Sequence, residues 1–197
     1  MGTVKSLLLG MCFVLGACTS QTSTVQTTEK GTQWEWQNGT IVVKTPERPA
    51  GQKSVLGLTT PKLEAVRVGF VGLGMRGPGA VERFTYIPGT QVVALCDYEE
   101  ARADKCQELL KKASMPKAAV YSGDKGYEEL CKRDDIDLVY IAADWLHHFP
   151  VAKCALENGK NVAIEVPSAM NLQECWDLIN SVSYTHLRAH ETSAHLV

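Results

Sequence analysis

The stretch VRVGFVGLGMRGPG, residues 66–79, decides the fold. Its first half is apolar and rich in valine, which is typical of a buried parallel strand. Its second half places Gly72, Gly74 and Gly77 in the spacing G-x-G-x-x-G, directly before an apolar helical pattern. In that context the first glycine makes a tight turn, the second lets a pyrophosphate approach the backbone, and the third allows close helix–strand packing. The stretch therefore predicts a phosphate-binding loop.

Strands and helices are expected to alternate downstream of this loop, because β-branched apolar runs are separated by amphipathic ones. The expected strands are 65–73, 90–97, 118–122, 136–143 and 161–167, and the expected helices are 77–87, 98–113, 124–133, 147–160 and 171–182. Parallel strands need such crossovers. The sequence thus predicts an α/β fold with a doubly wound parallel sheet, a Rossmann-type domain over residues 61–182.

Three local signals mark the ends of these helices. Asp124 is a candidate N-cap. Asn171 and Glu174 have the spacing of a capping box. The pair Asn158-Gly159 favours a helix end.

An acidic residue, Asp97, ends the second expected strand, 25 residues after Gly72. A carboxylate near this spacing accepts hydrogen bonds from the adenosine ribose and repels a 2′-phosphate. The motif therefore predicts NAD rather than NADP as the cofactor. The alternative is a glycine turn beside a solvated aspartate.

Two further strand ends carry polar or aromatic residues. Trp145, His147 and His148 follow the fourth strand, and Glu165 follows the fifth. Ligands of open α/β sheets bind beyond the carboxyl ends of the strands, so these residues are candidates for contact with a cofactor or substrate. The alternatives are core packing for the tryptophan, surface or capping roles for the histidines, and a helix-dipole role for Glu165.

Composition narrows the class of protein. The chain has 197 residues, 45% of them hydrophobic, and a net charge of −2. This is enough for one domain with extensions, and there is no basic stripe of the kind that binds nucleic acid. Seven cysteines occur singly, without a C-x-x-C pair, so neither a metal site nor a disulfide framework is predicted. The spacing of His186 and His190 alone is not taken as a metal site.

The N-terminus resembles a bacterial lipoprotein signal peptide over residues 1–18. Lys5 precedes an apolar run that ends in small residues before Cys18. Lipidation of Cys18 would make the protein an exported, membrane-anchored lipoprotein that faces the periplasm; the alternative is an ordinary signal peptide. Residues 19–60 are expected to form a flexible tether and N-terminal extension, with a short strand at Trp34 and Trp36 docking on the body.

A family resemblance rests on GLGMRGPGAV (72–81), the Asp after VVALC (92–96), the W-L-H-H phrase (145–148) and GKNVAIEVPSAM (159–170). Together they resemble the Gfo/Idh/MocA oxidoreductases and, within them, glycoside hydrolase family 109, over residues 45–181. The resemblance implies that the cofactor contacts, besides the glycines, are Met75, Arg76, Asp97, Trp145, Leu146, His147, His148, Glu165 and Val166.

Two departures from the wider family are visible. Ala143-Asp144 replaces the usual Thr-Pro before the tryptophan, which puts the local turn in question. Val166 stands where related dehydrogenases have a lysine that is associated with proton transfer, which favours a glycosidase over a simple sugar dehydrogenase.

The resemblance implies an NAD-dependent α-N-acetylgalactosaminidase. In that chemistry the sugar is oxidised at C3, the glycosidic bond breaks by elimination, water adds, and the hydride returns. Net hydrolysis with tightly bound, internally recycled NAD requires no cytoplasmic cofactor pool. The alternatives are a periplasmic NAD-dependent sugar dehydrogenase and a non-catalytic NAD-binding module.

The end of the chain, residues 183–197, does not continue the pattern, and no further strand is expected there. It is interpreted as a tail that does not belong to the natural protein. The family's second, substrate-binding domain is expected to be missing, and with it the main catalytic residues. The fragment is therefore expected to be inactive alone; its glycan substrate and oligomeric state are left open.

Overall fold

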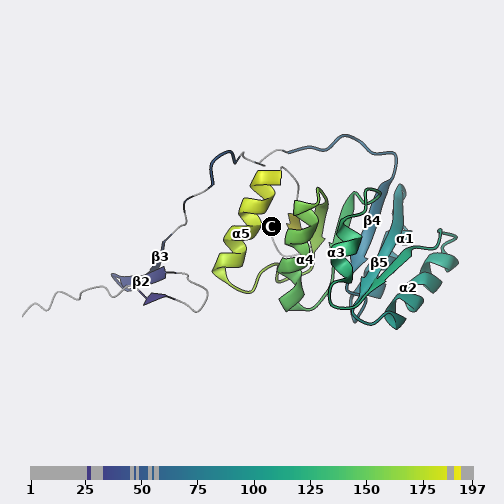
Figure 1. Ribbon diagram of the computed structural model, residues 1–197, viewed down its shortest axis with the longest axis horizontal. Helices are drawn as coiled ribbons and strands as arrows, with labels where there is room; N and C mark the ends of the chain where they lie inside the picture. Colours follow the sequence, from purple (N-terminus) through teal and green to yellow (C-terminus); the bar gives the residue numbers. More distant parts are fainter. Residues whose placement is uncertain are drawn as a thin grey trace, which may run out of the picture. The chain divides into compact units, whose positions relative to one another are not determined.

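A parallel sheet of six strands is the centre of the α/β part of the protein in the computed structural model (Figure 1). The strands are adjacent in the order β6-β5-β4-β7-β8-β9. Their bounds are β4 Val66–Val71, β5 Thr90–Asp97, β6 Ala119–Ser122, β7 Leu138–Ile141, β8 Asn161–Ile164 and β9 Ala189–Glu191. The structure describes residues 26–27, 33–44, 47, 49–52, 55, 58–185 and 189–191.

Five helices connect these strands. They are α1 Gly77–Thr85, α2 Ala101–Lys112, α3 Gly126–Cys131, α4 Trp145–Glu157 and α5 Leu172–Thr185. Every neighbouring pair of strands in this sheet is parallel. The predicted doubly wound α/β fold is thus confirmed.

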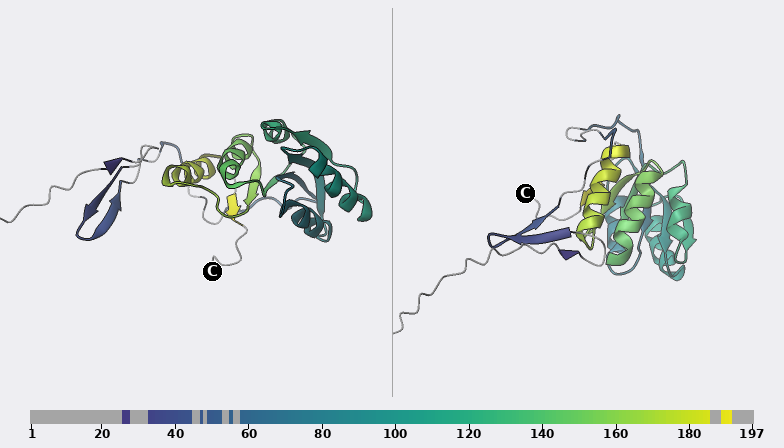
Figure 2. Two further views of the ribbon diagram at one scale, coloured as in Figure 1. Left: turned by 90° about the horizontal axis from the view of Figure 1, so that it is seen from below. Right: turned by 60° about the vertical axis from the view of Figure 1, so that its left-hand side comes forward.

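The helices cover both faces of the sheet (Figure 2). Side chains of β4 alternate between the faces, so Val68 and Phe70 pack with α1 and α2, while Val71 packs with α3, α4 and α5. The strands β4, β5, β7 and β8 therefore carry buried or half-buried residues on both sides, as the apolar runs of the sequence predict, whereas the edge strand β6 exposes Val120 and Ser122.

The strand order reverses beside β4. The chain runs outward from β4 to β5 and β6, then returns through α3 to place β7 on the other side of β4. Helices leave in opposite directions at such a switch point, which opens a crevice at the carboxyl ends of the strands. The candidate site lies there.

Local capping differs in part from the expectations. Asn158 is the C-cap of α4, and Gly159 follows with φ +75°, as predicted. Asn171 accepts a hydrogen bond from the Glu174 N–H, as in the predicted capping box. The N-cap expected at Asp124 is wrong, because α3 begins at Gly126 after Lys125, without a side-chain cap.

Two boundaries at the carboxyl edge of the sheet also differ. Helix α4 begins at Trp145, two residues earlier than expected, because Asp144 caps it through the Leu146 N–H. Strand β8 ends at Ile164, so Glu165, Val166 and Pro167 form a loop rather than a continuation of the strand. Both changes bring predicted site residues to the mouth of the crevice.

The expectation that no strand follows residue 182 is wrong. Helix α5 continues to Thr185 with Ser183 buried, and the backbone of Ala189–Glu191 pairs in parallel with Val162–Ile164 of β8.

The N-terminal unit, within Met1–Lys44, is compact in its own right. It contains an antiparallel sheet of β1 Gln26–Thr27, β2 Gln33–Gln37 and β3 Thr40–Val43. The segment expected to be a tether with one short strand thus carries a small sheet, whose β2–β3 turn uses Asn38 and Gly39 at positive φ. The signal-peptide and lipidation predictions, at 1–18 and Cys18, lie outside the described residues.

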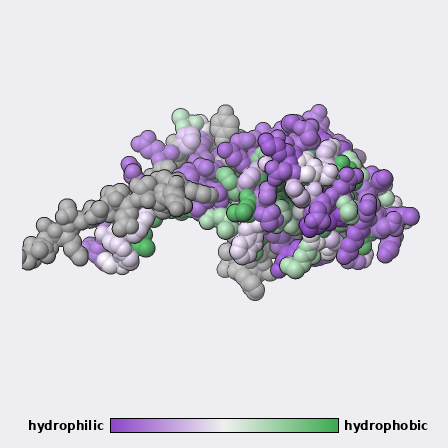
Figure 3. Space-filling model, turned by 60° about the horizontal axis from the view of Figure 1, so that its bottom comes forward, coloured by the Kyte–Doolittle hydropathy of each residue, from purple (hydrophilic) through white to green (hydrophobic). Residues whose placement is uncertain are grey.

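The surface of the α/β unit is mostly hydrophilic over its helices on the face shown in Figure 3, with smaller hydrophobic areas between them. No described helix is both long enough and apolar enough to cross a membrane. Within the described part of the chain, no group of three or more His, Cys, Asp or Glu side chains is placed to hold a metal ion.

Candidate cofactor-binding site

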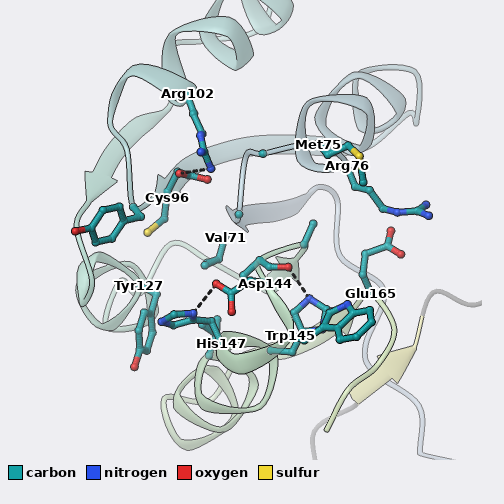
Figure 4. A pocket seen from close by; sticks show the side chains of 18 of the residues that line it. Val71, Met75, Arg76, Cys96, Arg102, Tyr127, Asp144, Trp145, His147 and Glu165 are labelled. Atoms are coloured by element: carbon teal, nitrogen blue, oxygen red, sulfur yellow. Dashed lines mark hydrogen bonds and ion pairs between the residues drawn. The ribbon is translucent and has the colours of Figure 1, made fainter. Parts of the chain in front are cut away.

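A pocket of about 930 Å³ lies at the carboxyl edge of the sheet (Figure 4). Its walls come from the segments that follow β4, β5, β6, β7 and β8. In the close-up, Arg76 and Glu165 lie on one side of the pocket, and Tyr127 and His147 lie on the other. The pocket therefore occupies the position where open α/β sheets bind their ligands.

The glycine loop forms one wall, and each glycine has a different environment. Gly72 has φ +91°, and a Cβ there would lie 2.3 Å from the backbone nitrogen of Ala143. A Cβ on Gly77 would lie 2.1 Å from the carbonyl oxygen of Gly72. A Cβ on Gly74 would meet only an Arg102 guanidinium nitrogen, at 3.5 Å. The first and third glycines are thus required by packing, whereas the second leaves open backbone for a ligand.

Helix α1 begins directly behind this loop. Its N-cap, Arg76, makes no side-chain capping hydrogen bond, and its first turn carries no acidic residue. Such a helix N-terminus offers unpaired N–H groups and a positive dipole end to a phosphate. Met75, 94% exposed, and Arg76 extend into the pocket mouth. The wall therefore fits the pyrophosphate of a dinucleotide.

Asp97 is buried at the end of β5 and tied to the glycine loop. One of its carboxylate oxygens accepts the Leu73 N–H at 2.6 Å, and the other accepts the Glu99 N–H at 3.0 Å. The Arg102 guanidinium lies 3.4 Å from Asp97 and 2.9 Å from Glu99. Because Arg102 faces two carboxylates, this corner keeps a net negative charge, which suits a ribose hydroxyl better than a 2′-phosphate.

The opposite wall begins with Asp144, the N-cap of α4. One of its oxygens accepts the Leu146 N–H at 3.0 Å, and the other lies 2.6 Å from Nδ1 of His147. Nε2 of His147 lies 3.7 Å from the Asp124 carboxylate. Burial is the largest single influence on the Asp144 carboxyl and raises its pKa. The hydrogen bond and charge of His147, together with the backbone N–H groups of Leu146 and His147, outweigh it and lower the pKa overall. The imidazole is therefore held between two acids at the pocket edge.

His148 connects the two loops of this wall. It is 1% exposed, with Nδ1 2.7 Å from the carbonyl oxygen of Pro167 and Nε2 3.0 Å from that of Ala143. Those carbonyls belong to the segments after β8 and after β7. The ring thus fixes the distance between two strand-end loops.

Glu165 and Val166 complete the wall. The Glu165 N–H donates to the carbonyl of Ile141 at 2.9 Å, and its carboxylate accepts a hydrogen bond from the Tyr140 hydroxyl at 2.7 Å. Val166 is 45% exposed and lines the pocket.

Burial raises the pKa of the Cys96 thiol to about 12, so this lining cysteine stays a neutral thiol.

The structure gathers most of the predicted site residues around one pocket. The residues that line it are Gly72, Gly74, Met75, Arg76, Asp97, Trp145, His147, His148, Glu165 and Val166. Gly77 and Leu146 do not: Gly77 packs against Gly72, and Leu146 is 74% exposed. Trp145 is 60% exposed, so the alternative of core packing is wrong.

Several residues that line the pocket were not predicted from the sequence, among them Tyr98, Arg102, Asp124, Tyr127 and Asp144. A signal existed for three of them, because Tyr98, Asp124 and Asp144 lie within three residues of the ends of strands whose carboxyl ends share one edge. Arg102 and Tyr127 are the second residues of α2 and α3, where nothing in the sequence marks them.

Comparison with known proteins places the fold and the family. Residues 66–192 match the Gfo/Idh/MocA family, described as an oxidoreductase family with an NAD-binding Rossmann fold. The chain is 79% identical, over 181 residues, to glycosyl hydrolase family 109 protein 4 of Phocaeicola vulgatus, a match that covers 91% of this chain and 35% of that one. It is 55% identical over 183 residues to glycosyl hydrolase family 109 protein 1 of Bacteroides thetaiotaomicron, covering 92% and 38%.

A solved structure, myo-inositol dehydrogenase from Lactobacillus casei in complex with NAD(H) and myo-inositol, superposes with a TM-score of 0.52 at 25% identity, covering 59% of this chain and 33% of that one. The chain spans about a third of the length of the curated relatives that it matches. The glycine loop, the uncapped helix N-terminus and Asp97 fit the cofactor in that family's description. The chain therefore belongs to the Gfo/Idh/MocA family of NAD-binding Rossmann-fold oxidoreductases, and its curated relatives at high identity are named as family 109 glycosyl hydrolases.

Proposed function

We propose that the whole protein is a glycosidase that cleaves α-linked N-acetylgalactosaminides with tightly bound NAD, which is used and restored within each turnover. The chain described here supplies the cofactor-binding half. The substrate-binding domain and the main catalytic acid and base belong to the remaining part of the longer protein.

The pocket chemistry at Val166 is the observation that carries this proposal. Val166 reaches the pocket at the position where the dehydrogenases of the resemblance have a lysine, and none of the described lining residues is a lysine. An amine for proton transfer to or from an alcohol is thus missing from this half of the site. That supports a glycosidase over a simple sugar dehydrogenase, as do the names of the relatives at 79% identity.

The residues of this chain bind and orient the cofactor. We assign the pyrophosphate to the backbone of Gly74 and the α1 N-terminus, and the adenosine ribose to Asp97. The Glu165 carboxylate faces the other end of the pocket, where it accepts a hydrogen bond from a cofactor or sugar hydroxyl. When bound, NAD supplies reversible acceptance of a hydride; the protein supplies position and electrostatics.

We also propose that the protein is exported and anchored by lipid on Cys18, facing the periplasm. A reaction with no net redox change suits that location, because no external nicotinamide pool is consumed. Cys18→Ala in the source bacterium is expected to move the protein from the membrane to the soluble fraction. Retention at the membrane by this variant would contradict the anchor.

The test of the function uses the full-length protein. It is purified without added nucleotide, denatured, and assayed for released NAD; a second sample receives p-nitrophenyl α-N-acetylgalactosaminide without nucleotide. Released NAD together with nitrophenol formation supports the proposal. Protein that is empty as purified, requires added NAD and accumulates NADH would contradict it and identify a dehydrogenase.

A further inference from the structure

We infer that Tyr140 is a positioning residue for the cofactor pocket: its hydroxyl fixes the orientation of the Glu165 carboxylate. Tyr140 does not line the pocket, and it lies inside β7 rather than at a strand end. The inference rests on the proposed contact between Glu165 and a bound ligand.

The sheet register brings the two side chains together. Tyr140 is paired with Ala163 across β7 and β8. Glu165 follows the last residue of β8, but its N–H still donates to the Ile141 carbonyl of β7, so the pairing continues by one residue. Glu165, two residues beyond Ala163, therefore projects toward the same face as Tyr140. The Tyr140 hydroxyl then reaches the Glu165 carboxylate at 2.7 Å.

The tyrosine ring is a rigid support for this bond. Tyr140 is 5% exposed, and its ring centroid lies 5.2 Å from that of Phe70 and 5.5 Å from that of Phe84. Close packing on these rings leaves the hydroxyl little freedom. A glutamate side chain has three rotatable bonds, so ordering it costs conformational entropy. A hydrogen bond from a fixed donor orders the Glu165 carboxylate before a ligand binds, so less entropy is lost on binding.

The backbone around Glu165 is held as well. Its N–H donates to Ile141 at 2.9 Å, and the Pro167 carbonyl lies 2.7 Å from the His148 ring. Backbone and side chain are therefore fixed by separate partners. Loss of the Tyr140 hydroxyl is expected to release the carboxylate while leaving the loop in place.

The experiment measures binding of NADH to the chain by fluorescence titration for Tyr140→Phe, Glu165→Ala and the double variant. Tyr140→Phe keeps the aromatic packing and is expected to weaken NADH binding by about three- to tenfold, the usual range for the net contribution of one hydrogen bond. In the Glu165→Ala background the same change is expected to alter affinity by less than about twofold, since no carboxylate remains to be positioned.

Tyr121→Phe is the matched control. Its hydroxyl accepts a hydrogen bond from Arg133 at 3.0 Å, and it does not line the pocket. It is expected to lower the melting temperature to a similar extent as Tyr140→Phe while leaving NADH affinity unchanged.

Two outcomes would overturn the inference, and they differ. If Glu165→Ala weakens binding but Tyr140→Phe does not, Tyr140 does not position the carboxylate. If neither variant affects binding, the proposed contact of Glu165 is wrong, and the inference that rests on it is wrong too. An equal loss from Tyr140→Phe with and without Glu165 would likewise contradict positioning through that residue.

Discussion

The two walls of the pocket are built differently. The wall of the glycine loop and α1 is made of backbone: Gly72 lies against Ala143, Gly77 lies against Gly72, and Gly74 leaves the main chain open. The wall after β7 and β8 is made of side chains: Asp144 holds His147, His148 bridges two carbonyls, and Tyr140 holds Glu165.

This difference gives the two walls different roles: one binds the dinucleotide, and the other acts at its reactive end. A backbone wall recognises phosphate by geometry, so it suits any dinucleotide. A side-chain wall presents carboxylate and imidazole groups, so it decides what happens at the reactive end. Substitutions in the first wall should act on folding or on binding as a whole, whereas those in the second should have graded effects.

The largest effect is expected from Gly72→Ala. The new methyl group would overlap the Ala143 backbone, at 2.3 Å, in a residue whose φ of +91° already disfavours a side chain. The free energy of unfolding should fall by more than about 3 kcal/mol, measured by urea denaturation.

Gly74→Ala is the matched control for that prediction. Its methyl group meets only a flexible arginine end at 3.5 Å, so stability should change by less than about 1 kcal/mol. NADH binding should nevertheless weaken by about tenfold or more, because the methyl occupies the approach of the pyrophosphate. Undiminished binding by Gly74→Ala would show that the cofactor does not lie against this wall.

His148→Leu tests the side-chain wall. The substitution removes a buried ring that contacts the carbonyl oxygens of Ala143 and Pro167, both in half-buried residues. The free energy of unfolding should fall by about 2–3 kcal/mol, with weaker NADH binding, as measured by denaturation and titration.

The neighbouring change His147→Leu is the comparison, because this side chain is 43% exposed and its contacts with Asp124 and Asp144 reach solvent. It should cost less than about 1 kcal/mol. Equal losses from the two histidine variants would refute the bridging role of His148.

Asp97→Asn changes a residue that lies where the backbone wall meets the side-chain wall. The amide cannot accept from Leu73 and from Glu99 and Arg102 as a carboxylate does. NADH binding should weaken by about tenfold, and the preference for NADH over NADPH should narrow, because a charge that repels a 2′-phosphate is lost. Parallel titrations with both nucleotides measure this, and an unchanged ratio would remove Asp97 from cofactor selection.

The smallest effect is expected far from both walls, at the amino end of the sheet. The Arg67 guanidinium bonds to the Asp137 carboxylate at 2.7 and 2.9 Å, and the hydrogen bond from Arg67 lowers the pKa of Asp137 below its ordinary 3.8. A carboxyl whose pKa is lower in the folded state than in the unfolded state stabilises the fold at pH values above its unfolded-state pKa. This stabilisation is lost as the pH falls through the folded-state pKa. Asp137→Asn should therefore flatten the decline of melting temperature below about pH 4 and leave NADH affinity unchanged. A decline as steep as in the original chain would assign the acid sensitivity elsewhere.

The backbone wall could be predicted from the sequence almost completely. Its determinants are consecutive: the strand, the glycine spacing and the helix lie within residues 66–87, and Asp97 ends the very next strand. Glycine spacing and apolar periodicity are local properties, so they can be recognised from the sequence alone. In the side-chain wall, His147, His148 and Glu165 were predicted as site residues, but Asp144, Tyr140 and all of the contacts were not.

The sequence by itself determined the order of strands and helices, the phosphate loop and the edge of the sheet at which a ligand binds. Only the tertiary structure decided that Tyr140 reaches Glu165, that His148 joins Ala143 to Pro167, and that Arg102 lies beside Asp97. It also decided that Ala189–Glu191 extend the sheet, where the sequence pattern predicted no strand. The physical reason is that these contacts depend on strand register and on how each helix is placed after its strand, even where two residues are only five positions apart, as Arg102 and Asp97 are. Local residue patterns do not encode that geometry.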